Sequence, residues 1–142
     1  KAAGTYSITL TNADSQSATL GSAFTYVSMA QLQWQRGTVS PNPPDPDTFG
    51  PAAINITHTY TLKNVGNAVS STVTVSIGGT NATGWFKGTD TCSSSALAAG
   101  ASCTVQATFL GGGLPTGAYT ATLDVTATSG GSDSNTMNGS VP

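Results

Sequence analysis

Apolar and polar side chains alternate strictly over residues 54–62, and this pattern limits the fold of the chain more than any other feature. One face would carry Ile54, Ile56, His58, Tyr60 and Leu62. A period of two is typical of a β-strand with one buried face. The same period recurs at 72–77, 104–109 and 119–128, whereas no useful length shows the 3.6-residue period of an amphipathic helix. The sequence therefore predicts an all-β protein.

Composition supports β structure in a single domain. Charged residues make up 7% of the chain and glutamate is absent, so the residue types that usually occupy exposed helix faces are scarce. Glycine- and asparagine-containing turns separate the alternating segments at 64–67, 78–79 and 111–117. Several short strands joined by such turns predict a two-sheet antiparallel sandwich over residues 1–142. Residues 137–141 would add a short final edge strand.

The first third of the chain departs from this pattern. Residues 4–11 predict an extra N-terminal strand, and residues 23–35 predict a longer β segment. The loop that follows, at 36–53, is rich in proline, which cannot sit in a paired ladder. Because prolines lower the cost of ordering a segment, we expect contact with something outside the sandwich to order this loop. Phe49 would be its apolar anchor.

Cys92 and Cys103 stand eleven residues apart. They are either two free buried thiols or a disulfide that braces the loop before the strand near Ser102. A surface poor in charge and rich in threonine and serine favours the disulfide and an extracellular or cell-surface location. No signal peptide is visible, and the start at Lys1 without methionine fits either a mature processed product or a trimmed piece of a longer chain.

Two separated stretches, residues 60–67 and residues 97–105 with the following Phe109, carry a family resemblance. They are similar to a strand-and-turn segment and a cysteine-bearing segment of bacterial immunoglobulin-like domains of the ASPM/Hydin-related kind. The resemblance covers residues 58–128. It implies an immunoglobulin-like sandwich with an architectural or binding role, and it brings no catalytic residues.

The resemblance also bears on the cysteines, because Cys92 stands where that family often places the partner of Cys103. The chain departs from the family pattern at residues 110–113, where the family usually has a proline. The first 50 residues have no counterpart in it.

Side chains suited to catalysis or metal binding are scarce. His58 is the sole histidine and no G-x-S-x-G elbow accompanies it, so no hydrolase triad is predicted. One histidine and two cysteines do not complete a zinc site. Asp45 and Asp47 fall short of the roughly 6–8 oxygens that calcium takes. We expect no catalytic residue, metal or cofactor, and interpret His58 as half-buried with one hydrogen-bond partner.

Charge and hydropathy exclude two classes of partner. The net charge is −2 and the four cations are scattered, so no basic patch is available for nucleic acid. No apolar run approaches the roughly 20 residues that span a bilayer. The expected partners are therefore copies of this chain itself, or glycans.

Three aromatic residues beside loops are candidates for an interface. These are Trp34, Phe49 and Trp85, which are either core residues, anchors between subunits or parts of a sugar-binding platform. N-glycosylation sequons begin at Asn55, Asn81 and Asn138, and they matter in a source that glycosylates secreted proteins.

The sequence favours a structural subunit of an extracellular filament or pilus-like fibre made of copies of this chain. A nearly uncharged surface would not oppose close packing of identical copies. Residues 4–11 would add a strand to a neighbour's sheet through Tyr6, Ile8 and Leu10, or else form the first strand of their own domain. The alternative functions are an adhesive or carbohydrate-binding module of a surface protein and a decoration domain on a virus particle.

Overall fold

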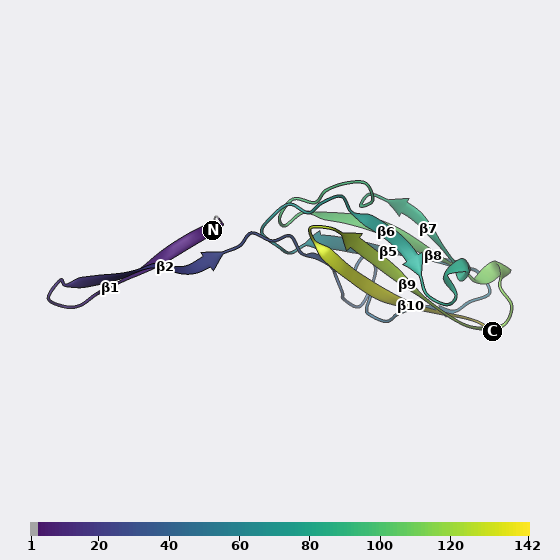
Figure 1. Ribbon diagram of the computed structural model, residues 1–142. Helices are drawn as coiled ribbons and strands as arrows, with labels where there is room; N and C mark the ends of the chain where they lie inside the picture. The colour runs from purple at the N-terminus through teal and green to yellow at the C-terminus, as the bar shows by residue number, and fades with distance from the viewer. Residues whose placement is uncertain (1–2) are drawn as a thin grey trace.

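The computed structural model describes residues 3–142, and Lys1 and Ala2 lie outside the described residues. Residues 30–142 form a sandwich of two four-stranded β-sheets, and residues 4–26 form a separate two-stranded hairpin. The hairpin projects from one end of the sandwich, and the C-terminus lies at the other end (Figure 1). The all-β sandwich is confirmed, whereas the extra N-terminal strand is one half of a hairpin.

The first sheet has the strand order β4-β10-β9-β6. Its strands are β4 (Asp47–Pro51), β10 (Gly131–Val141), β9 (Gly117–Ala127) and β6 (Thr74–Gly78). β9 and β10 pair antiparallel along their whole length. β4 adds to the other edge of β10 in parallel, so one pair in this sheet departs from the antiparallel pattern.

The second sheet has the order β3-β5-β8-β7 and is antiparallel throughout. Its strands are β3 (Leu32–Trp34), β5 (Asn55–Asn64), β8 (Ser102–Leu110) and β7 (Trp85–Asp90). A single 3-10 turn, η1 (Ala82–Gly84), precedes β7, and another, η2 (Gly111–Gly113), follows β8.

Large side chains from both sheets fill the space between them. Those with less than 2% of their surface exposed include Trp34, Phe49, Tyr60, Phe109, Leu123 and Met137. Phe109 of β8 packs directly against Gly139 of β10, where an added Cβ would lie 2.8 Å from the ring. A residue without a side chain is therefore what lets the two sheets close over this ring.

Cys92 and Cys103 form the expected disulfide, with their Cα atoms 5.2 Å apart. Both are buried in the core of the sandwich. The bond ties the loop that follows β7 to the start of β8. A closed loop of this length stabilises a fold by roughly 2–3 kcal/mol on the chain-entropy account.

Two expectations about strand limits are wrong. Residues 23–35 do not form one segment, because β2 (Ser17–Tyr26) ends before an irregular stretch and β3 begins at Leu32. The stretch between them bonds to the turn at 64–68 instead of to a strand. The last strand is not a short edge strand, because β10 runs over eleven residues between β4 and β9.

The proline-rich loop, residues 36–53, folds onto its own sandwich, so the expected contact outside the sandwich is wrong. Phe49 is fully buried in the core, and β4 within the loop pairs with β10. The prolines at 41–46 all precede β4, so they remove no hydrogen bond from its ladder. Pro51 is the exception to the expected exclusion of proline, because it is the last residue of β4 and lies opposite Ser140 of β10.

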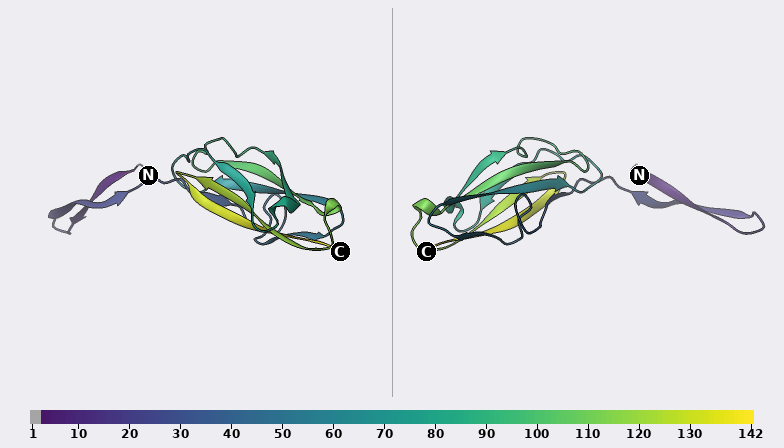
Figure 2. Two further views of the ribbon diagram at one scale, coloured as in Figure 1. Left: turned by 45° about the vertical axis from the view of Figure 1, so that its right-hand side comes forward. Right: turned by 180° about the vertical axis from the view of Figure 1, so that it is seen from behind.

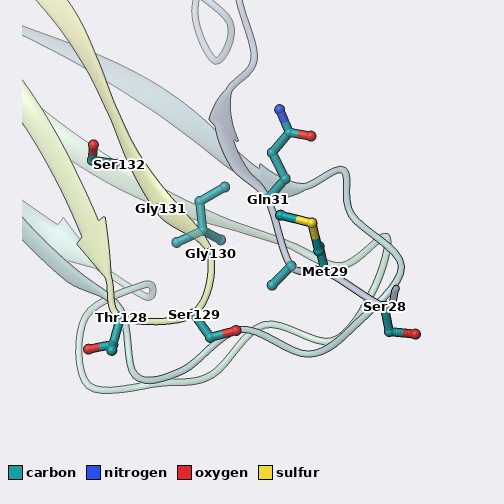
Figure 3. Close-up of a pocket in the computed structure, with 10 residues that line it drawn as sticks. Ser28, Met29, Gln31, Thr128, Ser129, Gly130, Gly131 and Ser132 are labelled. Atoms are coloured by element: carbon teal, nitrogen blue, oxygen red, sulfur yellow. The ribbon is translucent and has the colours of Figure 1, made fainter. Parts of the chain in front are cut away.

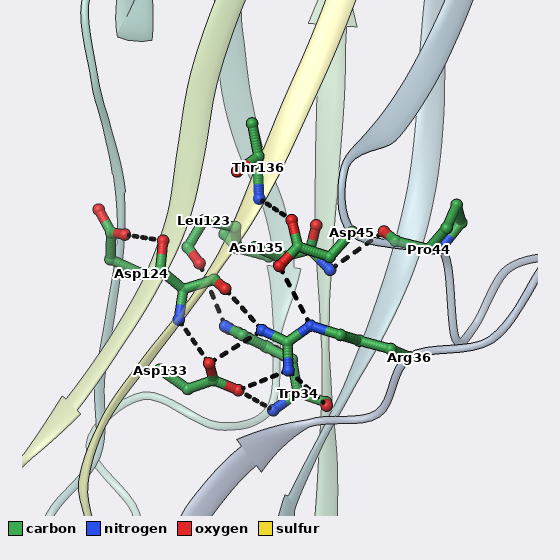
Figure 4. A network of polar contacts seen from close by, with 10 residues as sticks. Trp34, Arg36, Pro44, Asp45, Leu123, Asp124, Asp133, Asn135 and Thr136 are labelled. Carbon is green, nitrogen blue, oxygen red and sulfur yellow. Dashed lines mark hydrogen bonds and ion pairs between the residues drawn. The ribbon is translucent and has the colours of Figure 1, made fainter.

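A polar network locks this loop to β10 (Figure 4). The guanidinium group of Arg36 donates to Asp45 at 3.2 Å and to Asp133 at 2.9 Å. The backbone N–H of Trp34 also donates to Asp133 at 2.7 Å, and that of Thr136 donates to Asp45 at 3.0 Å. Burial alone would raise the pKa of Asp133, but the bonds from Arg36 and Trp34 outweigh it and lower that pKa.

Candidate functional site

The N-terminal hairpin stands apart from the core of the molecule (Figure 2). Strand β1 (Gly4–Thr11) pairs antiparallel with β2, and a shift of register between Tyr6 and Ile8 marks a bulge. We call the turn at 12–16 the tip, and the segment 26–31 that enters the sandwich the root. Residues 4–11 therefore pair within their own chain but outside the sandwich, and their exchange between copies stays a prediction.

One face of the hairpin is a ladder of apolar cross-strand pairs. From root to tip these are Tyr6 with Phe24, Ile8 with Leu20, and Leu10 with Ala18. The rings of the first pair stack with their centroids 5.4 Å apart. Leu10 and Leu20 expose 75% and 66% of their surface. Tyr6, Ile8 and Leu10, through which residues 4–11 would add to a neighbour's sheet, thus lie on one face of the hairpin, which we call the apolar face.

The opposite face of the hairpin is polar. Threonines pair across it, with hydroxyl oxygens 2.8 Å apart for Thr9 and Thr19 and 3.4 Å apart for Thr5 and Thr25. Asp14, at the tip, is the sole charged residue of the sequence from 4 to 26. The hairpin is therefore an amphipathic ribbon that carries almost no charge.

Asn67 fixes the root to the end of the sandwich. Its Oδ1 accepts a hydrogen bond from the N–H of Met29 at 2.7 Å, and its own N–H donates to the Met29 carbonyl at 2.9 Å. Its Nδ2 donates to the hydroxyl of Tyr26, at the end of β2. One side chain thus binds both the last residue of the hairpin and the link to the core.

The other residues of the turn at 64–68 complete this attachment, and we call the turn the socket. Asn64, which is fully buried, accepts from the N–H of Gln31 at 3.0 Å and donates to the Leu97 carbonyl at 2.9 Å. Gly66 lies so close to the root that an added Cβ would be 2.3 Å from the Met29 carbonyl oxygen. Sequence reasoning missed these roles, because the motif indicated a turn and not what the turn holds.

A cleft of about 660 Å³ opens beside the root (Figure 3). Segments 28–32 and 128–132 line it. These segments contain no charged residue, no histidine and no aromatic residue. The cleft therefore offers neither acid–base groups nor a stacking platform for a ligand.

His58 lies against the buried Asp47, with Nδ1 and Oδ2 2.8 Å apart, and its ring stacks on Phe49 with centroids 4.2 Å apart. Tyr60 donates to the same Oδ2 at 2.6 Å. Burial, and then the hydrogen bond to Asp47, raise the pKa of Tyr60. The expected half-buried histidine with a hydrogen-bond partner is confirmed, and the cluster ties β4 to β5.

The three aromatic interface candidates lie in the core of the sandwich. Trp34, Phe49 and Trp85 expose 1%, 0% and 5% of their surface. Trp34 also donates from its indole N–H to the carbonyl of Leu123 at 3.1 Å. Of the alternatives that the sequence left open for them, the structure therefore supports a position in the core, because their side chains fill the space between the two sheets.

The three sequon asparagines lie on the sandwich. Asn55 is exposed, whereas Asn81 and Asn138 are half-buried. Their amide oxygens accept hydrogen bonds from Gly112 N–H, Thr120 N–H and the Thr120 hydroxyl, respectively. Glycosylation at these positions stays a prediction.

The acidic pair of the proline-rich loop is split between two partners. Asp45 binds Arg36, whereas Asp47 binds His58 and Tyr60. Across residues 3–142, no group of three or more His, Cys, Asp or Glu side chains is placed to hold a metal ion. The same part of the chain has no helix long and apolar enough to cross a membrane.

Comparison of sequences finds no family profile and no curated protein that match this chain. Solved structures do match it. The secreted serine protease VesC from Vibrio cholerae matches 78% of this chain at 18% identity and a TM-score of 0.52. This chain covers 23% of the VesC chain, and 32% of the second V. cholerae protease VesB, which matches with a TM-score of 0.50.

Two further structures match over more of the chain. The ASH/PapD-like domain 7 of human CEP192 matches 84% of this chain and 91% of its own, at 14% identity and a TM-score of 0.51. A protein of unknown function from Porphyromonas gingivalis W83 matches 99% of this chain and 67% of its own, at 10% identity and a TM-score of 0.53. At these identities the likeness concerns the fold alone, which is an immunoglobulin-like sandwich.

Proposed function

We propose that this chain is a non-enzymatic structural subunit of an extracellular or cell-surface assembly, joined to copies of itself through the N-terminal hairpin. The observation that carries the proposal is the apolar face, where Ile8, Leu10 and Leu20 each expose more than half of their surface. A two-stranded hairpin alone in water is marginally stable at best, so a partner that covers this face would stabilise it. An exposed apolar ladder on a projecting element is typical of an interaction surface.

Charge and redox chemistry support the same proposal. Residues 4–26 carry one charged side chain, so like-charge repulsion opposes the approach of two copies very little. The disulfide between Cys92 and Cys103 suits an oxidising, extracellular compartment. The resemblance to ASPM/Hydin-related domains of bacterial surface proteins also favours an architectural role.

The pairing of β1 with β2 affects how residues 4–11 could be exchanged between copies. β1 already pairs with β2, so exchange of residues 4–11 alone would first have to break that ladder. The hairpin as a whole is therefore the unit that we propose a neighbour meets. A pilus-like filament would require this contact together with a second one elsewhere on the sandwich.

Alternative functions have less support from the geometry. The single histidine is engaged by Asp47 and Phe49, which favours a structural and not a catalytic role for it. An adhesive module that binds glycans would display an aromatic platform, yet Trp34 and Trp85 are buried. We therefore place self-association ahead of glycan binding, attachment to a virus particle and catalysis.

Two matched pairs of substitutions test the proposal in the full chain. The variant Leu10→Asp/Leu20→Asp places charges on the apolar face, whereas Thr9→Asp/Thr19→Asp places them on the polar face of the same strands. We expect light scattering and negative-stain microscopy to show assemblies of the wild type and of the threonine variant, but monomers of the leucine variant. A wild-type chain that stays monomeric at millimolar concentration would refute self-association.

A further inference from the structure

We propose that the apolar face of the hairpin packs against the same face of a second copy, with the two hairpins antiparallel and each tip at the partner's root. The inference rests on the proposed function and adds the partner surface and its orientation. Three properties of the described residues favour this arrangement, namely side-chain size, charge and area.

Side-chain size changes along the apolar face. The row nearest the root holds two stacked rings, Tyr6 and Phe24, whereas the row nearest the tip holds Leu10 and Ala18. In an antiparallel pair, the row with the large rings of Tyr6 and Phe24 in one copy lies against the row with the smaller Leu10 and Ala18 in the other. The gap between the two ribbons then stays even along its length, as close packing requires.

Charge favours the same orientation. Asp14 lies at the tip, and Lys63 lies at the end of β5 beside the socket that holds the root. Arg36 and Lys87 are both in ion pairs, whereas Lys63 forms none within residues 3–142. Antiparallel packing brings each Asp14 to the end of the partner that carries Lys63. Parallel packing would instead set the two Asp14 side chains together, where they repel.

The area of the apolar face determines how much more of the partner's surface the contact must include. Eight residues of β1 span roughly 26 Å and two strands are roughly 10 Å wide, which gives about 260 Å² for the apolar face. A standard stable interface buries about 800 Å² on each partner. In the antiparallel pair the tip also reaches the exposed apolar residues around the partner's root. These are Val27, Met29, Val65 and Val69, which expose 61%, 65%, 42% and 59% of their surface.

Two consequences follow from this geometry. The contact is small, so association is weak and depends on protein concentration. It is also two-fold and closes on itself, so a longer filament needs a second contact elsewhere on the sandwich.

Cysteine cross-linking tests the arrangement in the full chain, whose two native cysteines are both held in the disulfide. Ile8 lies in the middle row of the apolar face, so two copies of Ile8→Cys would meet across the two-fold axis. We expect mild oxidation to give disulfide-linked dimers of Ile8→Cys. The control Thr9→Cys, on the polar face, should stay monomeric on non-reducing gels.

A charge exchange tests the orientation. Asp14→Lys and Lys63→Asp should each raise the dimer dissociation constant on the order of fivefold, because one attraction becomes a repulsion in two symmetric places. The double variant Asp14→Lys/Lys63→Asp should recover the wild-type constant in analytical ultracentrifugation. Single variants that match the wild type, or a double variant that is weaker than both, would overturn the antiparallel orientation.

The outcomes separate this inference from the proposed function. If the leucine variant abolishes association but Ile8→Cys does not cross-link, the hairpin is the contact and the face-to-face arrangement is wrong. If the leucine variant associates like the wild type, the hairpin is not the contact and both proposals fail. Equal cross-linking of Ile8→Cys and Thr9→Cys would likewise overturn the face-to-face arrangement.

Discussion

The carboxamide oxygen of Asn67 lies 2.7 Å from the backbone nitrogen of Met29. The N–H of Asn67 returns a bond to the Met29 carbonyl at 2.9 Å, so the two residues form a closed ring of hydrogen bonds. The hairpin therefore leaves the sandwich through a fixed attachment. A fixed direction matters for an interaction element, because less conformational freedom is lost when a partner binds.

We predict that Asn67→Ala loosens the root without unfolding the sandwich. The change removes the bonds from Met29 N–H and to the Tyr26 hydroxyl, each worth about 1 kcal/mol. Hydrogen exchange of residues 26–31 should become faster, while exchange in β8 and β9 stays slow. Asn81→Ala is the control, because it removes a similar bond to Thr120 in another part of the sandwich. Unchanged exchange at the root would contradict the role of Asn67.

We predict that Gly66→Ala destabilises the fold by roughly 1–3 kcal/mol. The new Cβ would lie 2.3 Å from the Met29 carbonyl oxygen and 2.6 Å from the Gln31 nitrogen, so backbone must move. Urea unfolding measures the loss. Gly113→Ala is the control, since no atom lies within 4 Å of the Cβ that it adds. Equal midpoints for the two variants would show that the root does not press on the socket.

Sequence periodicity located the sandwich strands well where one face of a strand packs on the core. β5, β8 and β9 begin and end within two residues of the alternating segments that predicted them. The disulfide was predictable because the sequence contains two cysteines, so one pairing is available.

β10 escaped the same reasoning because its inward face is not uniformly apolar. Gly139 takes a position that the ring of Phe109 fills, and Asn135 faces inward with its amide 3.3 Å from the Pro44 carbonyl. The alternation is therefore weak in a strand that lies between two others. The pattern of side chains along β10 cannot reveal that Gly139 faces the core, because the space beside Gly139 is filled by Phe109 from another strand.

Of the two hairpin strands, β1 was predicted from the sequence and β2 was not, for a related reason. β1 alternates cleanly, whereas β2 contains a bulge with Ser22 at a φ of 53°, which interrupts its period. The role of Asn64 and Asn67 depends on a segment over 30 residues earlier in the chain. Such long-range bonds to backbone atoms leave no trace in local sequence.

We predict that Asp90 contributes to the free energy of unfolding and that acid removes this contribution. Burial by itself raises the pKa of Asp90, but hydrogen bonds from Lys87, Ser93 and the backbone outweigh it and lower the pKa to about 2. Because this pKa is lower in the folded state than the 3.8 of the unfolded chain, the stabilisation is present above pH 3.8. It is lost as the pH falls toward 2, and it is on the order of 2 kcal/mol.

Chemical unfolding between pH 2 and 5 measures this contribution against Asp90→Asn. The asparagine keeps an acceptor for the N–H groups of Cys92 and Ser93, which lie 2.8 and 2.9 Å from Oδ1. The wild type should lose more stability than the variant across this range, and the difference should vanish near pH 2. Parallel curves would mean that Asp90 titrates alike in the folded and unfolded chains.

We predict that Tyr60 limits stability at high pH. Burial, followed by the hydrogen bond to Asp47, raises its pKa above the usual 10.0, so the folded chain keeps a proton that the unfolded chain loses. Stability from this group is therefore complete below pH 10 and falls above it, by about 1.4 kcal/mol for each pH unit. Tyr60→Phe should remove that slope, yet be less stable at neutral pH because Asp47 loses one of its two side-chain donors. Urea unfolding from pH 7 to 11.5 distinguishes the two effects. A wild type and a variant with the same slope above pH 10 would show that the phenol of Tyr60 ionises as readily in the folded chain as in the unfolded one.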